Sequence, residues 1–201
     1  MKLFRRKPSP ESLLAQLLPK IESGSLTEVG DTIAQHPKII DAANEYGMTP
    51  LLYAIYRNQP AIVKTLLEKG ASPLPSNPRA AVPLTLAVLE NQPQNVQTLL
   101  EYHAPVDQGD QYGATPLMYA TQHGRTKIAS ILLEAGANLE ARDAEGETVL
   151  MYALTHNQPN MLKLLLQKGA NPQARNFDNQ DAYDKAFTPE LRQVLEEFAP
   201  H

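Results

Sequence analysis

The sequence predicts an all-α fold, a solenoid of about six stacked helix-turn-helix units joined by short hairpin loops. The first reason is a hexapeptide that recurs every 33 residues: TPLLYA from Thr49, VPLTLA from Val82, TPLMYA from Thr115 and TVLMYA from Thr148. The second reason is that other columns keep this step, among them the leucine pairs that start at Leu66, Leu99, Leu132 and Leu165. A fixed period of this length indicates repeats that bury their apolar faces only against one another.

Each repeat opens with a residue that favours a turn. The openers are Asn44, Asn77, Asp110, Asp143 and Asn176. Their short polar side chains can bond nearby backbone, and glycines three residues later, such as Gly47, supply positive φ at the loop tip. Thr49 followed by Pro50 then predicts a helix start, with threonine as the cap and proline in the first helical position.

The rest of each repeat predicts two helices packed closely against their neighbours. A small residue lies in each first helix, at Ala54, Ala87, Ala120 and Ala153, where helices can approach one another. The leucine pairs form the inner face of the second helix. A glycine before alanine, as in Gly70-Ala71, closes that helix in the left-handed conformation. His103 takes the glycine position once, and histidine tolerates left-handed φ better than most residues.

The tripeptide NQP stands between the two helices at residues 58–60, 91–93 and 157–159. Its asparagine falls where left-handed φ is needed, a position held by Gly124 in the third full repeat. Its proline falls at the start of the second helix, where a missing N–H costs little. We therefore interpret NQP as a joint and not as a site.

Together, the T-P-L opening, the alanine three residues later, the leucine pair, the Gly-Ala and the 33-residue step resemble the ankyrin repeat, most clearly over residues 44–176. The resemblance implies protein binding without catalysis. The family usually has a histidine directly after T-P-L, which braces the loop. That position here holds Leu52, Thr85, Met118 and Met151, so we expect this brace to be missing and the loops to be softer.

The domain organisation follows from the repeat boundaries. We expect a basic, flexible leader over residues 1–10 and a single ankyrin-repeat domain over 11–201. That domain divides into an N-terminal capping repeat (11–43), four full repeats (44–76, 77–109, 110–142 and 143–175) and a C-terminal capping repeat (176–201). Terminal repeats differ from the others because one of their faces meets water. In the second loop, Pro75, Pro78 and Ala80 predict a hairpin of different shape.

Composition excludes several classes of protein. The chain has no cysteine, so it has no disulfide, thiolate metal site or cysteine nucleophile. The basic start is not followed by the apolar segment that a signal peptide would have. No other apolar segment is long enough to span a bilayer, so the sequence favours a cytoplasmic protein. The net charge is −4, and four of the 18 lysines and arginines lie in the leader against 22 acidic residues elsewhere. Such an acidic body disfavours nucleic-acid binding.

No motif in the sequence indicates catalysis. G-x-S-x-G, G-x-x-x-x-G-K and H-E-x-x-H are all missing. His123 and His156 share one column, but packed repeats would separate them by about 8–10 Å, too far for one small metal ion. Acidic pairs such as Glu145 and Glu147 have no base beside them in the sequence pattern. We therefore expect no catalytic, cofactor-binding or metal-binding residues, no cofactor and no enzyme activity.

The resemblance implies a concave binding face made of loop tips and the ends of first helices. Carried over by position, the tips contribute Glu45, Tyr46, Met48, Arg79, Gln111, Tyr112, Glu145 and Glu147, and the helix ends contribute Tyr56, Arg57, Leu89, Glu90, Gln122, His123, Thr155 and His156. Tyrosine and arginine are enriched at interface hot spots. A second column, Tyr53, Leu86, Tyr119 and Tyr152, could pack between repeats or contact a partner.

Three hypotheses for function remain open at this point. The first is a protein–protein interaction module, monomeric when unbound, that grips one protein partner on its concave face. The second is an inhibitor or immunity-type protein that blocks a cognate enzyme or toxin. The third is a membrane-surface scaffold that uses the leader, whose four cations and two apolar residues would bind anionic lipid only weakly.

Overall fold

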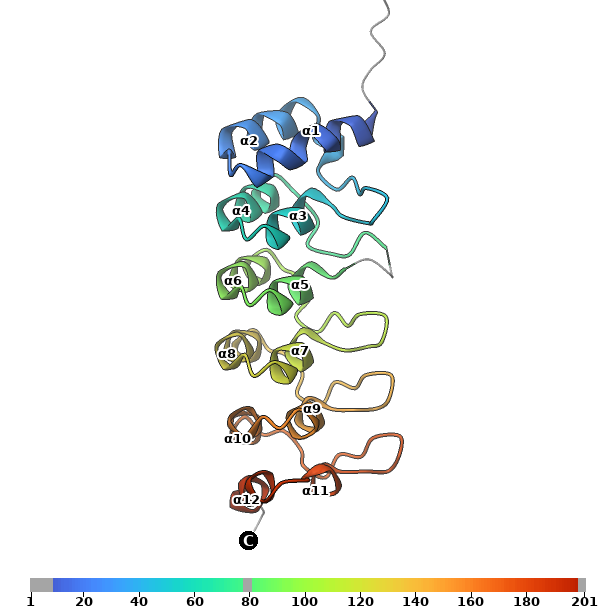
Figure 1. Ribbon diagram of the computed structural model, residues 1–201, viewed down its shortest axis with the longest axis vertical. Helices are drawn as coiled ribbons and strands as arrows, with labels where there is room; N and C mark the ends of the chain where they lie inside the picture. The colour runs from blue at the N-terminus through green and yellow to red at the C-terminus, as the bar shows by residue number, and fades with distance from the viewer. Residues whose placement is uncertain (1–8, 78–80, 199–201) are drawn as a thin grey trace, which may run out of the picture.

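The computed structural model describes residues 9–77 and 81–198, which form twelve α-helices and one short 3₁₀ helix, without a strand. The helices stack as pairs in a single row (Figure 1). Most of the predicted leader, and Arg79, lie outside the described residues. The predicted leader ends one residue late, because Pro10 already belongs to the first helix, where the Ser9 hydroxyl accepts a hydrogen bond from the Ser12 N–H.

The helices form two layers. The first layer contains α1 (Pro10–Glu22), α3 (Pro50–Tyr56), α5 (Pro83–Leu89), α7 (Pro116–Gln122), α9 (Val149–Thr155) and α11 (Ala182–Lys185). The second contains α2 (Leu26–Gln35), α4 (Pro60–Glu68), α6 (Pro93–Glu101), α8 (Thr126–Glu134), α10 (Pro159–Gln167) and α12 (Pro189–Glu197), while the 3₁₀ helix η1 spans Pro37–Ile39. Neighbouring members of the first layer pack on one another throughout the row. None of these helices is long and apolar enough to cross a bilayer.

Local chemistry starts and ends the helices where the sequence predicts. The Thr49 hydroxyl accepts the Leu52 N–H at 3.2 Å, and Pro50 occupies the first turn of α3. The asparagine of each NQP has positive φ, as does Gly124 in the third full repeat. His103 also adopts positive φ, at +63°, in the position that is glycine in the other full repeats. These predictions are confirmed.

The core runs continuously between the two layers. The first leucine of each pair is fully buried, at Leu66, Leu99, Leu132 and Leu165, and so are Ala54, Ala87, Ala120 and Ala153 in the first layer. Each repeat therefore depends on its neighbours for burial of its apolar face, as expected for a solenoid.

The glutamine of NQP connects adjacent repeats. Its side-chain amide donates a hydrogen bond to a main-chain carbonyl at the end of the preceding first-layer helix, in the pairs Gln59 to Glu22, Gln92 to Ile55 and Gln158 to Gln122. The Gln92 bond is the shortest, at 2.8 Å, and Gln92 is buried. Arg125 takes the glutamine position in the third full repeat, and its buried Nη1 has no hydrogen-bond partner. NQP is thus a joint within a repeat and a clasp between repeats.

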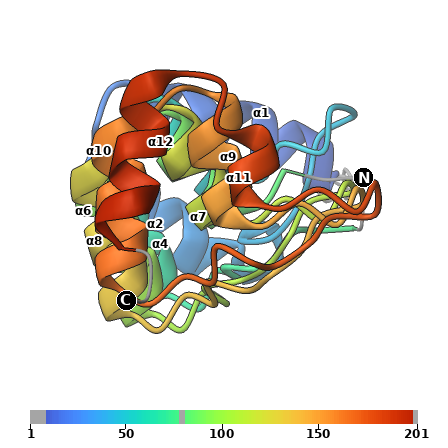
Figure 2. The same cartoon turned by 90° about the horizontal axis from the view of Figure 1, so that it is seen from below.

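Long loops project from the first layer before α3, α7, α9 and α11, so that these repeats are L-shaped in profile (Figure 2). We call residues 44–48, 110–114, 143–147 and 176–180 fingers 1, 3, 4 and 5. Neighbouring fingers are joined through their backbones, because Ala144 N–H donates to Tyr112 O at 2.8 Å and Phe177 N–H donates to Glu145 O at 3.1 Å. Fingers 3, 4 and 5 therefore form a connected row.

Candidate protein-binding surface

Several of the predicted binding residues are large and exposed. Tyr46 in finger 1 is 82% exposed and Tyr112 in finger 3 is 59% exposed. Tyr56 and Leu89, at the ends of α3 and α5, are also exposed. These side chains stand on the loops and on the helix ends next to them, the two elements that meet at an angle in each repeat (Figure 2).

The structure holds some of the predicted residues in internal contacts. Arg57 forms an ion pair with Glu22 of the preceding repeat. The Tyr53 hydroxyl donates to the same carboxylate at 3.4 Å. Met48 is partly buried at the base of finger 1. Arg57 is therefore already paired within the chain, although its side chain stays partly exposed.

A shallow depression of about 380 Å³ brings five predicted residues together on the C-terminal half of the surface. These are Gln122, Glu145, Glu147, Thr155 and His156; Asp143, Tyr152, Asp178 and Lys185 complete the lining. The Glu147 carboxylate is mostly buried, 2.7 Å from Lys185 Nζ, and it also accepts a hydrogen bond from Asn176 Nδ2 at 2.8 Å. Glu145, in contrast, is exposed and free to meet a partner's donor.

Tyrosines of the first layer tie two fingers to their own helices. The Tyr119 hydroxyl donates to Asp110 Oδ2 at 2.6 Å, and the Tyr152 hydroxyl donates to Asp143 Oδ2 at 2.7 Å. The other oxygen of Asp143 accepts the N–H groups of Glu145 and Glu147 within finger 4. These links replace the histidine brace that the sequence lacks, so fingers 3 and 4 are anchored. Sequence reasoning missed them, although the Asp-to-Tyr spacing of nine residues repeats.

The electrostatics of these links follow from burial. Burial first, and then the hydrogen bond to Asp110, raises the pKa of Tyr119 to about 12. The same causes, with Asp143 as the acceptor, raise the pKa of Tyr152 still more. Both phenols therefore stay protonated, and remain hydrogen-bond donors, at any physiological pH.

The two histidines of the surface lie in different surroundings. The His156 ring stacks on Tyr152 with 5.8 Å between the ring centroids, and its Nδ1 lies 3.0 Å from the Tyr152 carbonyl oxygen. Burial lowers the pKa of His123, and the nearby Arg125 and His156 add to this effect. His123 therefore favours the neutral form at pH 7.

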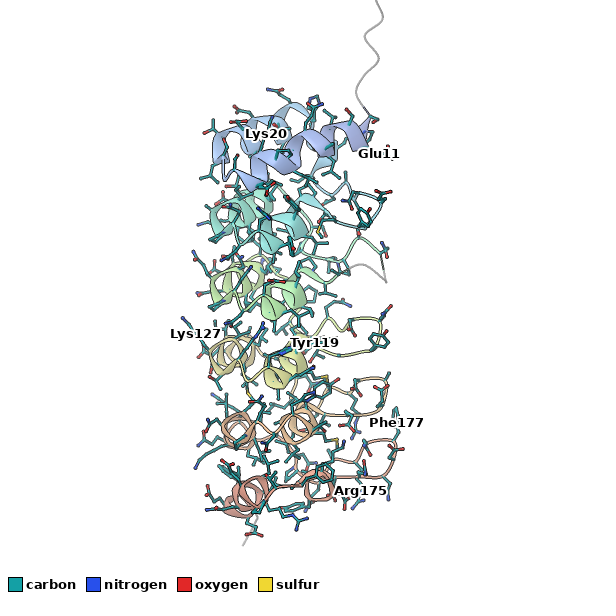
Figure 3. The ribbon with its side chains drawn as sticks, in the orientation of Figure 1. Glu11, Lys20, Tyr119, Lys127, Arg175 and Phe177 are labelled. Atoms are coloured by element: carbon teal, nitrogen blue, oxygen red, sulfur yellow. The ribbon has the colours of Figure 1, made fainter. Side chains whose placement is uncertain are left out.

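Sequence reasoning also missed an exposed aromatic residue in finger 5. Phe177 is 74% exposed, and Figure 3 places it among the loops, on the side of the stack opposite Lys127. Its ring lies against Gly146 in finger 4, where an added Cβ would stand 2.8 Å from the Phe177 ring. The repeat register could have identified it, because Phe177 stands directly after Asn176 and shares its column with the predicted tip residues Glu45 and Gln111. Phe177 extends the aromatic part of the surface to the C-terminal repeat.

Within residues 9–77 and 81–198, no group of three or more His, Asp or Glu side chains is arranged to hold a metal ion. The acidic residues of the C-terminal depression are bonded to tyrosine, lysine and backbone groups or exposed to solvent. The arrangement offers hydrogen bonds, charge and aromatic contact area to a ligand. These are the properties of a binding surface.

Comparison with known proteins identifies the family. Family profiles for ankyrin repeats match residues 46–78 and, as three copies, residues 83–176, which together make up well over half of the chain. The chain therefore belongs to the ankyrin repeat family, whose members are generally non-enzymatic protein–protein interaction modules.

A solved structure supports the same fold. The crystal structure of EF0377, an ankyrin repeat protein, is similar to this chain with a TM-score of 0.82 and 21% sequence identity. The similarity covers 92% of this chain and 98% of that one. No curated protein sequence matches this chain significantly.

Proposed function

We propose that this chain is a non-catalytic module that binds one protein partner on the surface formed by its fingers and the ends of α3, α5, α7 and α9. We also propose that the chain is monomeric when unbound and acts in the cytoplasm. The observation that carries it is the exposure of Tyr46 and Tyr112 at finger tips. Tyrosine is enriched in the cores of protein interfaces and at their hot spots, so these exposed side chains suit contact with a protein partner.

The way these side chains are held supports the proposal. Finger 3 is tied to α7 through Tyr119 and to finger 4 through its backbone, so the Tyr112 backbone is fixed before binding. Tyrosine has few rotatable bonds, and ordering it in a complex therefore loses little conformational entropy. A pre-organised surface with rigid aromatic anchors is suited to a specific protein partner.

The test is a double substitution, Tyr46→Ala with Tyr112→Ala, compared with the wild type in capture of a partner from native lysate and then in its purified affinity. Leu26→Ala is the matched control, because Leu26 is an exposed apolar residue of α2 in the second layer. We expect the double variant to lose at least about tenfold in affinity and the control to lose none. Full affinity in a folded double variant would contradict the proposal.

A further inference from the structure

Helix α1 differs from the other first-layer helices in length. It spans 13 residues, whereas α3, α5, α7 and α9 span seven each. The additional turns lie at its N-terminal end and extend over the loop side of the stack, toward finger 1 (Figure 1). The N-terminal end of the binding surface therefore has a wall that the other repeats lack.

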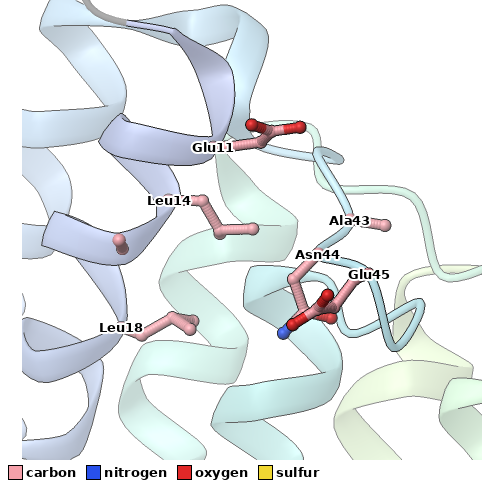
Figure 4. A pocket seen from close by; sticks show the side chains of 7 residues that line it. Glu11, Leu14, Leu18, Ala43, Asn44 and Glu45 are labelled. Carbon is pink, nitrogen blue, oxygen red and sulfur yellow. The ribbon is translucent and has the colours of Figure 1, made fainter.

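A pocket of about 600 Å³ lies between this wall and finger 1. Glu11, Leu14, Ala15 and Leu18 of α1 line one side, and Ala43, Asn44 and Glu45 line the other (Figure 4). Its volume falls in the range of sites that hold a ligand or several side chains of a peptide. Leucine and alanine supply an apolar floor beneath a polar rim.

The rim carries negative charge. Glu11 and Glu45 are exposed, they stand on opposite sides of the pocket, and no lysine, arginine or histidine belongs to the described lining. The Asn44 side-chain oxygen accepts the N–H groups of Tyr46 and Met48, so this oxygen is already used within finger 1. Two carboxylates around an apolar floor complement a segment that combines apolar and cationic side chains.

We propose that this pocket receives a basic, apolar segment of the protein partner, with an apolar side chain against Ala15 and Leu18 and a lysine or arginine beside each of Glu11 and Glu45. This inference rests on the proposed protein-binding function and names the chemistry of one part of the partner. The acidic body of the chain, which favours a cationic partner, acts in the same direction.

The probe is a capped hexapeptide, KALLRK, titrated into the full-length ¹⁵N-labelled protein and followed by amide chemical shifts. The charge-reversed peptide EALLEE is the control ligand. We expect KALLRK to shift the amides of residues 11–18 and 43–45, and EALLEE to leave them unchanged. Because the contacts are exposed, binding should weaken as salt is raised from low to physiological concentration.

Two variants test the roles of charge and space. The Glu11→Gln, Glu45→Gln double variant keeps the size of both side chains and should weaken KALLRK binding by about five- to tenfold. Its control, Glu68→Gln with Glu134→Gln, removes the same charge from exposed positions on α4 and α8 and should change affinity less than twofold. Ala15→Trp fills the pocket from an exposed position and should abolish binding.

Several results would overturn the assignment. Shifts centred elsewhere, equal weakening in both charge variants, or wild-type affinity in Ala15→Trp would each do so. If deletion of residues 1–8 raised the affinity for KALLRK many-fold, the chain's own leader would be the occupant of the pocket. If the Glu11→Gln, Glu45→Gln variant changed only the oligomeric state measured by sedimentation, the occupant would be a second copy of this chain. Suppose instead that a protein partner bound the Glu11→Gln, Glu45→Gln variant at full affinity and failed to bind the Tyr46→Ala, Tyr112→Ala variant. That result would support the proposed function and refute the role of this pocket.

Discussion

The hydroxyl of Tyr152 donates a hydrogen bond to Asp143 Oδ2 at 2.7 Å and so fastens finger 4 to helix α9. Asp143 is buried, and its other oxygen accepts two backbone N–H groups of the finger. Removing the hydroxyl would leave one carboxylate oxygen without its donor. An unpaired polar atom at a buried site costs more than the bond itself is worth.

Tyr152→Phe should therefore lower the free energy of unfolding by about 2 kcal/mol, and Tyr119→Phe by about 1 kcal/mol because Asp110 is less buried. Tyr53→Phe is the matched control, since the Tyr53 hydroxyl reaches an exposed Glu22 at 3.4 Å, and should change stability by less than about 0.5 kcal/mol. Urea unfolding followed by circular dichroism measures all three. Equal losses in the three variants would contradict a special role for the Asp–Tyr links.

The same links predict a loss of stability at high pH. The pKa of Tyr119 is raised to about 12, whereas tyrosine in the unfolded chain titrates near pH 10. Because the unfolded state loses this proton first, the stabilisation is fully present below about pH 10 and declines as the pH rises toward 12. The urea midpoint should fall over that interval. The Tyr119→Phe, Tyr152→Phe double variant should show a shallower decline, and an unchanged slope would refute the linkage.

The hydrogen bonds of Gln92 predict how much the clasp between repeats contributes to stability. Its Nε2 donates to Ile55 O at 2.8 Å and its Oε1 accepts the Asn95 Nδ2–H at 2.6 Å. Gln92→Ala would strip both groups of their partner in a buried site and should cost about 2–3 kcal/mol. Gln59→Ala removes a 3.4 Å bond at a more exposed joint and should cost less than about 0.5 kcal/mol. Thermal unfolding distinguishes the two, and similar losses would argue against burial as the cause.

Replacing His103 should raise the stability of the protein, in contrast to the substitutions above. It adopts φ of +63° where Gly70, Gly136 and Gly169 stand in the other full repeats. A side chain in the left-handed region costs free energy that glycine avoids, although glycine loses more entropy on folding. His103→Gly should raise stability by about 0.5–1 kcal/mol, whereas the control Gly136→Ala should lower it by a similar amount. A destabilised His103→Gly protein would show that the imidazole has a favourable contact.

Local features of this fold could be predicted from the sequence, and long-range ones could not. Positive φ at Asn58, Asn91 and Asn157 follows from the sterics of single residues and is confirmed. The Gln92 clasp joins groups 37 positions apart, in different repeats, and no pattern within one repeat reveals its acceptor. The Asp–Tyr links repeat in the sequence as a nine-residue spacing, but only the fold brings the loop aspartate and the helix tyrosine into contact.

The candidate surface divides in the same way. The repeat register places Tyr46, Tyr112 and Tyr56 correctly on exposed loops and helix ends, and their role in binding stays a prediction. The pocket beside Glu11 could not be anticipated, because the additional turns of α1 have no counterpart in the 33-residue repeat. Phe177 shares a column with Glu45 and Gln111, so the register could have identified it, but the last repeat was interpreted as a cap and contributed no residue to the predicted surface.

The clasp has an evolutionary consequence. Its donor is a glutamine side chain, but its acceptor is a main-chain carbonyl, which every amino acid supplies. A duplicated repeat that carries NQP can therefore form this hydrogen bond with whichever repeat precedes it, and no matching mutation in that repeat is needed. An array of this kind can lengthen or shorten by whole units and keep its joints, so the reach of its surface can change faster than its architecture.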